Sequence, residues 1–272
     1  MKVAFQGEAG AYSEEAGHGY FGAVEMIPCE SFEIVFDKVS SGECQSGLIP
    51  IENSLAGSIH HNYDLLLRHQ LHIIGEYYLR VQHCLISFPD VKLNEITQVM
   101  SHPQALGQCD GYLRELGVKI NPVYDTAGSV KMLKNSGARN TAAIASKRAA
   151  EIYKMKILEA GIEDNSENYT RFIEISPKAI APEGEVKTSI VVSLKNIPGA
   201  LFKALSVFAL RDIDLTKIES RPLAGRPWEY LFYIDFLGVV NEKNVQRALN
   251  HLDEYAIMLR VLGSYTRFSL GV

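Results

Sequence analysis

The chain of 272 residues is long enough for two domains at roughly 150 residues each. Its 47% hydrophobic and 22% charged residues are typical of a soluble globular protein, and no apolar run approaches the ~18 residues of a membrane span. The net charge of −5, without a basic tract, argues against nucleic-acid binding. Because the N-terminal run "MKVAFQGEAG" has the pattern of a strand and a turn, and not that of a secretion signal, we expect a cytoplasmic protein.

Strand and helix patterns alternate through the first 175 residues. Strands are predicted at 2–7, 46–53 and 141–146, and helices at 31–42, 104–117 and 126–137. Ser31 is expected to cap its helix, and Pro103 and Gly117 are expected to begin and end the next one. This alternation predicts an α/β fold with one open, mostly parallel sheet or two such sheets.

A change of pattern follows residues 176–187, which contain two prolines, a glycine and mixed charge. We therefore predict one domain at 1–180 and a second at 186–272. The second shows a strand at 188–195, a helix at 199–212, strands at 215–223 and 229–238 joined by the turn "AGRPW", a helix at 242–255 and a strand at 257–265. This βαββαβ order is ferredoxin-like.

Charge is unevenly distributed between these two parts. Residues 186–272 carry 11 Lys and Arg against 8 Asp and Glu, a net charge of +3, which leaves −8 on residues 1–185. An anion bound by the first part must therefore be held by local donors, because the overall field opposes it.

Five short polar segments of the first domain contain the candidate ligand-binding residues. They are "GEAGAYS" (7–13), "ENSLAGS" (52–58), "SHPQALGQ" (101–108), "DTAGS" (125–129) and "ENYTRF" (167–172). In open α/β sheets, anions bind where strands end and helices begin. Their hydroxyls, amides and glycine N–H groups suit a small polyoxygenated anion, although each segment taken alone is also explained by helix capping.

Other candidate sites are weaker. The cysteines Cys29, Cys44, Cys84 and Cys109 form no CxxC pair, so we expect buried reduced thiols. Adjacent His60 and His61 do not face each other on a helix, and a solvated helix start is the better interpretation than a metal site. His102 either caps a helix or lines the pocket.

The motifs together resemble a known family. "GEAGAYSEEA", "PIENSLAGS", "SHPQALGQC" and "NYTRF", followed by "PGALF" and "ESRP", are similar to prephenate dehydratase with a C-terminal ACT regulatory domain. The resemblance implies a two-lobed catalytic domain like that of periplasmic binding proteins, then a ferredoxin-like ACT domain. It implies the monofunctional form of a lyase that converts prephenate to phenylpyruvate in phenylalanine biosynthesis, without a cofactor or metal, under feedback inhibition by L-phenylalanine.

The resemblance also implies roles for individual residues. The catalytic set falls on Thr170, Asn53, Ser101 and Gln108. Substrate contacts fall on Arg171 and Phe172 of the "TRF" motif and, from the polar segments, on Ser13, Ser54, Ser58 and Thr126. A phenylalanine site between two subunits of a homodimer or homotetramer falls on Asn196, Gly199, Ala200, Leu201, Glu219, Ser220 and Arg221. Ala11 departs from the family pattern, which often has a hydroxyl residue there.

Thr170 suits this chemistry because a hydrogen-bond donor can stabilise a departing hydroxyl without titrating. Arg171 is harder to place, since neighbours on a strand point to opposite faces. It serves either as a clamp for a substrate carboxylate or as part of a structural ion pair. Two other functions remain open: arogenate dehydration, and a non-catalytic amino-acid sensor.

Overall fold

The computed structural model describes residues 1–223 and 229–269, so the predicted "AGRPW" turn (224–228) lies outside the described residues. The chain forms two compact units. Unit 1 comprises Met1–Asn62 and Tyr77–Phe172, and unit 2 comprises Tyr63–Glu76 and Ile173–Val272. None of the helices in the described ranges is long and apolar enough to cross a membrane.

The first lobe is a sheet of strands in the order β2-β1-β3-β11-β5, with β4 paired to β3. β1 runs parallel to both β2 and β3, as expected for successive βα units. Its elements are β1 (Lys2–Gln6), α1 (Tyr12–Phe21), β2 (Glu25–Cys29), α2 (Phe32–Ser40), β3 (Ser46–Asn53), β4 (Gly57–Ser58), α3 (His60–Arg68), β5 (His72–Arg80) and β11 (Tyr169–Ser176). The strands predicted at 2–7 and 46–53 are confirmed.

The helix predicted at 31–42 is also confirmed, and its capping shows why it begins where it does. The Ser31 hydroxyl accepts a hydrogen bond from the Ile34 N–H. Val35, Phe36 and Val39 are fully buried, so one apolar stripe fixes the helix against the sheet. α3 begins at His60, as the sequence indicated, and the described residues hold no cluster of metal-ligating side chains.

The second lobe is a sheet in the order β10-β6-β9-β7-β8. It contains β6 (Cys84–Ser87), β7 (Gln98–Ser101), α4 (Pro103–Gln108), α5 (Asp110–Leu116), β8 (Lys119–Pro122), α6 (Thr126–Ser136), β9 (Thr141–Ala145), α7 (Lys147–Tyr153) and β10 (Lys156–Ala160), with a short 3₁₀ turn η1 (Leu93–Glu95). The strand predicted at 141–146 and the helix predicted at 126–137 are confirmed.

Two sequence predictions for this lobe were incomplete. The sheet is mixed, because β6 runs antiparallel to both β9 and β10 while β7 is parallel to β8 and β9. β6 enters directly from the first lobe without a crossover helix, so no βα unit sets its direction. The helix predicted at 104–117 is two helices, broken at Cys109 (φ −120°, ψ 22°) and ended by Gly117 in the left-handed region (φ 68°).

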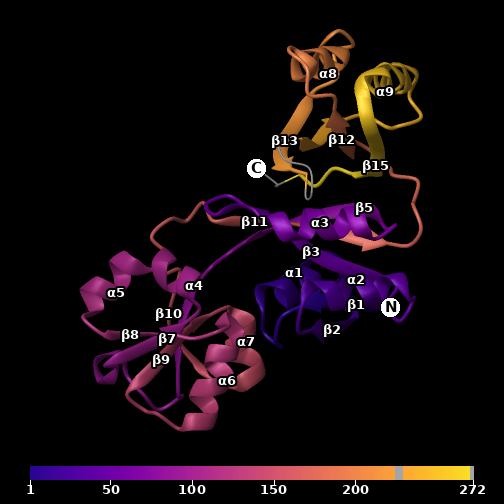
Figure 1. The fold of residues 1–272 in the computed structure, drawn as a ribbon. Coiled ribbons are helices and arrows are strands. Elements are labelled where there is room, and N and C mark those ends of the chain that lie inside the picture. Colours follow the sequence, from indigo (N-terminus) through magenta and orange to yellow (C-terminus); the bar gives the residue numbers. More distant parts are fainter. Residues whose placement is uncertain (224–228, 270–272) are drawn as a thin grey trace. The chain divides into compact units, whose positions relative to one another are not determined.

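Within unit 2, the predicted βαββαβ order is confirmed. Its elements are β12 (Val186–Leu194), α8 (Ala200–Ala209), β13 (Leu215–Pro222), β14 (Tyr230–Leu237), α9 (Lys243–Tyr255) and β15 (Ala256–Thr266). The sheet is antiparallel in the order β13-β14-β12-β15, and α8 and α9 lie on one of its faces (Figure 1). The core between them contains the fully buried side chains of Ile190, Phe208, Phe236 and Leu252.

Residues 63–76 belong to unit 2 although the rest of that unit begins only at Ile173, and nothing in the sequence indicated this. The Arg260 guanidinium donates hydrogen bonds of 2.9–3.3 Å to the carbonyl groups of Leu66, Leu67, His69 and Leu71, which satisfies the C-terminal end of α3. Lys187 Nζ lies 2.7 and 2.9 Å from the two carboxylate oxygens of Glu76, and both side chains are buried. These polar contacts hold the segment on the sheet of unit 2.

Candidate active site

Unit 1 contains a pocket of about 190 Å³ that gathers residues from distant parts of the sequence. They come from the start of α1, the end of β3, the residue before α3, the segment 81–83, both ends of α4, the start of α6 and the start of β11. The lining residues are Tyr12, Ser13, Pro50, Asn53, Ile59, Val81, His83, His102, Gln104, Ala105, Gln108, Thr126, Thr170 and Phe172. As expected for an α/β fold, strand ends and helix starts meet here.

Neutral donors and helix ends dominate this pocket. Among the described residues that line it there is no Lys, Arg, Asp or Glu. α1 and α6 both begin at the pocket, with Tyr12 and Thr126 as their first residues, and the start of α6 is already capped by the Asp125 carboxylate, which accepts the Gly128 N–H. At the start of α1, the N-cap residue Ala11 makes no side-chain capping bond, which leaves first-turn N–H groups open to an anion. The pocket can therefore bind an anion within a negatively charged region.

The hydroxyl of Thr170 is oriented by Asn53. The Oδ1 atom of Asn53 accepts the backbone N–H groups of Leu55 (3.1 Å) and Ala56 (2.9 Å), so the other end of this amide is the NH₂ group. That Nδ2 lies 3.0 Å from Thr170 Oγ1. Thr170 Oγ1 is therefore an acceptor, and the structure shows no protein acceptor for the hydroxyl proton in the described part of the chain. The proton is available to a ligand in the pocket.

Asn53 also begins a longer chain of hydrogen bonds. Its Nδ2 lies 2.8 Å from Asn168 Oδ1, and Asn168 Nδ2 lies 3.2 Å from Gln108 Oε1. Gln108 Oε1 lies 2.8 Å from His83 Nε2, and His83 Nδ1 lies 2.7 Å from the Tyr12 hydroxyl. Asn168 is fully buried and His83 nearly so. Five polar side chains from separate segments thus lead to Thr170 through one connected network.

Burial sets the protonation of the two titratable members of this network. It raises the pKa of Tyr12 well above its ordinary value, so the phenol keeps its proton. It lowers the pKa of His83, an effect that the hydrogen bond to Gln108 and the charge of Glu163 oppose. The imidazole is therefore neutral at physiological pH.

Six of the predicted site residues line the pocket: Ser13, Asn53, Gln108, Thr126, Thr170 and Phe172. Four others do not. The buried Ser101 hydroxyl donates to the Ile144 carbonyl (2.7 Å). The Ser54 hydroxyl donates to the Glu167 carbonyl and accepts the Tyr169 N–H, which ties the start of β11 to the end of β3. Ser58, in β4, and Arg171 complete this group.

Arg171 and His102, the two residues with open alternatives, are now placed. Thr170 and Phe172 line the pocket, and Arg171 between them does not, in keeping with the alternation of a strand. Its side chain is buried, which favours the structural role over that of a substrate clamp. His102 takes both of its predicted roles, since it lines the pocket and its Nδ1 accepts the Gln104 N–H at the start of α4.

The sequence interpretation did not name seven of the lining residues as site residues: Tyr12, Pro50, Ile59, Val81, His83, Gln104 and Ala105. Tyr12 lies within the "GEAGAYS" segment, where hydroxyls were already the candidates, so that motif contained a usable signal. His83 has no such signal, because "VQHC" has neither a turn nor a recognised motif. The predicted thiols are confirmed, since all four cysteines are free and buried.

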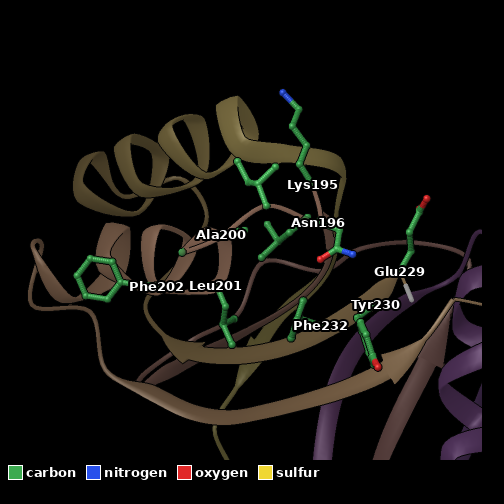
Figure 2. Close-up of a pocket in the computed structure, with 11 residues that line it drawn as sticks. Lys195, Asn196, Ala200, Leu201, Phe202, Glu229, Tyr230 and Phe232 are labelled. Atoms are coloured by element: carbon green, nitrogen blue, oxygen red, sulfur yellow. The ribbon is translucent and has the colours of Figure 1, made fainter. Parts of the chain in front are cut away.

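A second pocket, of about 250 Å³, lies in unit 2 (Figure 2). It is lined by Leu194, Lys195, Asn196, Ile197, Gly199, Ala200, Leu201, Phe202, Glu229, Tyr230 and Phe232. Four of the residues predicted for a phenylalanine site are among them: Asn196, Gly199, Ala200 and Leu201. Gly199 is the N-cap of α8 with φ 78°, a left-handed conformation that favours glycine.

The other three predicted effector residues, Glu219, Ser220 and Arg221, lie on β13 and do not line this pocket. Arg221 Nη2 lies 2.7 Å from Asp64 Oδ2, in the segment 63–76 of the same unit. The guanidinium of the "ESRP" motif therefore has a carboxylate partner within its own chain.

The fold and the pocket define a two-lobed α/β enzyme with a C-terminal βαββαβ domain. The family model "Prephenate dehydratase" matches residues 3–180, and the model "ACT domain" matches residues 188–254. The chain belongs to the prephenate dehydratase family, and its activity class is that of a carbon–oxygen lyase.

Individual relatives agree with this family. The chain is 48% identical over 276 residues to arogenate dehydratase/prephenate dehydratase 2, chloroplastic, of Arabidopsis thaliana, covering 97% of this chain and 72% of the relative. The prephenate dehydratase of Arthrobacter aurescens in complex with L-Phe is 33% identical with a TM-score of 0.90, covering 98% of this chain and 90% of that one. GqqA, described as a novel type of quorum-quenching acylase, is 32% identical with a TM-score of 0.91 and 97% coverage of both chains.

Proposed function

We propose that this chain converts prephenate to phenylpyruvate, with Thr170 as the donor to the departing hydroxyl. The observation that supports this role is the direction of the hydrogen bond from Asn53 Nδ2 to Thr170 Oγ1. Because the oxygen already accepts, the hydroxyl proton points to whatever occupies the pocket. Membership of the prephenate dehydratase family supports the reaction, and the hydrogen-bond geometry supports Thr170 as the donor.

The reaction needs little acid–base chemistry from the protein. The electron pair of the bond to the ring carboxylate enters the ring as carbon dioxide forms, and the pair of the carbon–oxygen bond leaves with the hydroxyl, which takes up a proton to become water. Aromatisation of the ring drives both steps. The protein has to fix the substrate and stabilise charge on the leaving oxygen, and a preorganised hydroxyl donor does this without titrating.

The remaining lining residues suit the rest of the substrate. We assign its carboxylates to the start of α1 and to the neutral donors Ser13, Thr126 and Gln108. Phe172 is buried beside Thr170 and offers an apolar wall for the ring. A weakly polar wall also leaves the reacting carboxylate poorly solvated, which favours decarboxylation. Ser101, Ser54, Ser58 and Arg171, which do not line the pocket, are assigned a supporting role around it.

We further propose that prephenate is preferred to arogenate. Arogenate carries an ammonium group where prephenate has a keto oxygen, and the described lining has no carboxylate to pair with it. A charge left without a partner in a pocket is costly, so we expect kcat/KM for prephenate to exceed that for arogenate by about tenfold or more. Steady-state kinetics on both substrates tests this. Faster turnover of arogenate would contradict the preference, and no turnover of either alongside tight phenylalanine binding would indicate an amino-acid sensor.

The pocket of unit 2 is our candidate for the L-phenylalanine effector. Its residues surround the uncapped start of α8, where free N–H groups can bind an amino-acid carboxylate. Leu201 and Phe232 provide apolar surface for an aromatic side chain, and Figure 2 shows both on the lining. Glu219, Ser220 and Arg221 complete the site, in this proposal, from a second subunit. Feedback inhibition follows if phenylalanine binds one global state of the enzyme more tightly than another.

The variant Gly199→Val is expected to raise the phenylalanine concentration for half-maximal inhibition by about tenfold or more while kcat stays within about twofold. A β-branched residue is strained at φ 78°, so the start of α8 must shift and its N–H groups lose their alignment. Inhibition curves measure the effect. Gly184→Val is the matched control, since Gly184 has φ 72° and open space around it but lies outside the pocket. Unchanged inhibition in Gly199→Val would place the effector elsewhere.

We also propose domains at 1–180 and 186–272, a cytoplasmic location and a homodimer or homotetramer. The ranges matched by the two family models, 3–180 and 188–254, support the division. The location stays a prediction, and the relative from Arabidopsis thaliana is named chloroplastic. Light scattering coupled to size-exclusion chromatography measures the oligomeric state.

A further inference from the structure

His83 lies at the far end of the network from Thr170, and its role follows from the direction of each hydrogen bond. Two backbone N–H groups fix the orientation of the Asn53 amide, so its Nδ2 donates to Asn168 Oδ1. The other end of the Asn168 amide is then a donor, and it donates to Gln108 Oε1. The backbone N–H groups of Leu55 and Ala56 therefore determine the hydrogen-bond direction at Asn53, then at Asn168, and then at the Gln108 oxygen.

His83 completes this assignment. Because Gln108 Oε1 is an acceptor, His83 Nε2 must carry the proton that lies between them at 2.8 Å. In the neutral ring, Nδ1 is then unprotonated and accepts the Tyr12 hydroxyl at 2.7 Å, the shorter of the two contacts of this hydroxyl, which also lies 3.1 Å from the Gln82 carbonyl. Both ring nitrogens are occupied by protein partners, so neither is left to transfer a proton to a substrate. This excludes a general-acid role for His83 although it lines the pocket.

The two ends of the Gln108 amide have different partners. Its oxygen accepts two N–H groups, from His83 and Asn168, which uses both of its lone pairs. Its nitrogen has no acceptor among the protein groups that the structure describes, and Gln108 lines the pocket. Without the N–H of His83, the oxygen keeps only the 3.2 Å hydrogen bond from Asn168, so the amide is held less firmly and can turn its oxygen toward the pocket, where it would repel an anionic substrate.

We propose that His83, held in its Nε2–H tautomer by the Gln108 oxygen and contacted at Nδ1 by Tyr12, is a positioning residue that directs the NH₂ group of Gln108 to a carboxylate of the substrate. The inference rests on the proposed function, since it needs an anionic substrate in this pocket. It places the acceptor side of the Gln108 amide in the protein and the donor side in the pocket.

Two neutral substitutions of similar length separate positioning from packing. His83→Gln keeps a nitrogen donor close to the position of Nε2, and His83→Met has none. We expect His83→Met to lower kcat/KM for prephenate about 10- to 100-fold, mainly through a higher KM, because a lost carboxylate contact weakens the ground state as well as the transition state. His83→Gln is expected to recover most of that loss. Equal activity of the two variants would overturn the proposal.

A double-mutant cycle with Gln108 tests whether His83 acts through it. In a Gln108→Ala background, His83→Met is expected to cost less than about threefold in kcat/KM, because there is no amide left to orient. Losses that multiply independently would show a role in packing alone. Thermal unfolding of each variant reports whether it folds. If His83→Met fails to fold, Tyr12→Phe takes its place: it removes the hydroxyl partner of His83 Nδ1 and should also lower kcat/KM.

The tautomer itself is measurable. An imidazole ¹⁵N spectrum of the wild-type protein should show His83 with Nε2 protonated and Nδ1 unprotonated, and the opposite tautomer would overturn the proposal whatever the kinetics show. A wild-type protein inactive on prephenate and arogenate would instead refute the proposed function while this spectrum still stands. The two failures are therefore distinguishable.

Discussion

Thr170→Ala is expected to lower kcat on prephenate about 10²- to 10³-fold, with a change of less than about threefold in KM. The hydroxyl donates to an oxygen that becomes charged only as the carbon–oxygen bond breaks, so its loss weakens the transition state and leaves substrate binding nearly intact. Removal of a single preorganised donor of this kind has an effect of that size in other enzymes. Steady-state kinetics with prephenate measures both constants.

Thr170→Ser is the matched control, because it retains a hydroxyl that can still accept from Asn53 Nδ2. We expect it to keep activity within about tenfold of the wild type. A Thr170→Ala variant with normal kcat would remove Thr170 from the chemistry. A large rise in KM at unchanged kcat would reassign it to substrate binding.

Asn53→Asp is expected to lower kcat by about 10²-fold or more, although the side chain keeps its shape. A carboxylate still accepts the Leu55 and Ala56 N–H groups but has no donor for Thr170. The Thr170 hydroxyl then donates to this carboxylate, so its proton is turned away from the pocket. The new charge also repels an anionic substrate, which should raise KM as well.

A cycle with Thr170→Ala identifies the cause of this loss. If Asn53 acts by orienting the hydroxyl, Asn53→Asp should lower kcat by less than about threefold in the Thr170→Ala background. A full additional loss there would mean that Asn53 also acts by a second route, either through Asn168 and Gln108 or by contact with the substrate. Asn53→Ala provides the uncharged comparison, since it removes the amide without adding repulsion.

Residues 31–42 and 188–265 illustrate what local patterns predict well. Apolar periodicity and the Ser31 cap located α2, and alternation of strand and helix patterns gave the complete βαββαβ order of unit 2. These features depend on near neighbours in the chain, where spacing alone determines which side chains share a face. The break at Cys109 was missed because a single non-helical residue leaves the helical spacing on both sides nearly unchanged.

The direction of β6 and the placement of residues 63–76 were beyond such patterns. A strand has the same residue pattern whether its neighbours run parallel or antiparallel to it, so the sequence could not distinguish β6 from the strands of βα units. Likewise, the carbonyl groups at the end of α3 do not reveal that Arg260, almost 200 positions later, donates to them. Partners far apart in sequence are decided by packing.

The same division applies to the pocket. The sequence by itself determined the motifs, the donor types and the alternation that sets Thr170 and Phe172 on one face of β11 and Arg171 on the other. Only the tertiary structure decided that Ser101 donates to Ile144 and that His83 joins Gln108 and Tyr12. The reason is the direction of the hydrogen bonds. An amide or a hydroxyl presents a defined donor to the pocket only when another protein group already binds its acceptor oxygen. In this protein that group is a pair of backbone N–H groups beside Asn53, from which the orientation of Thr170 and Gln108 follows.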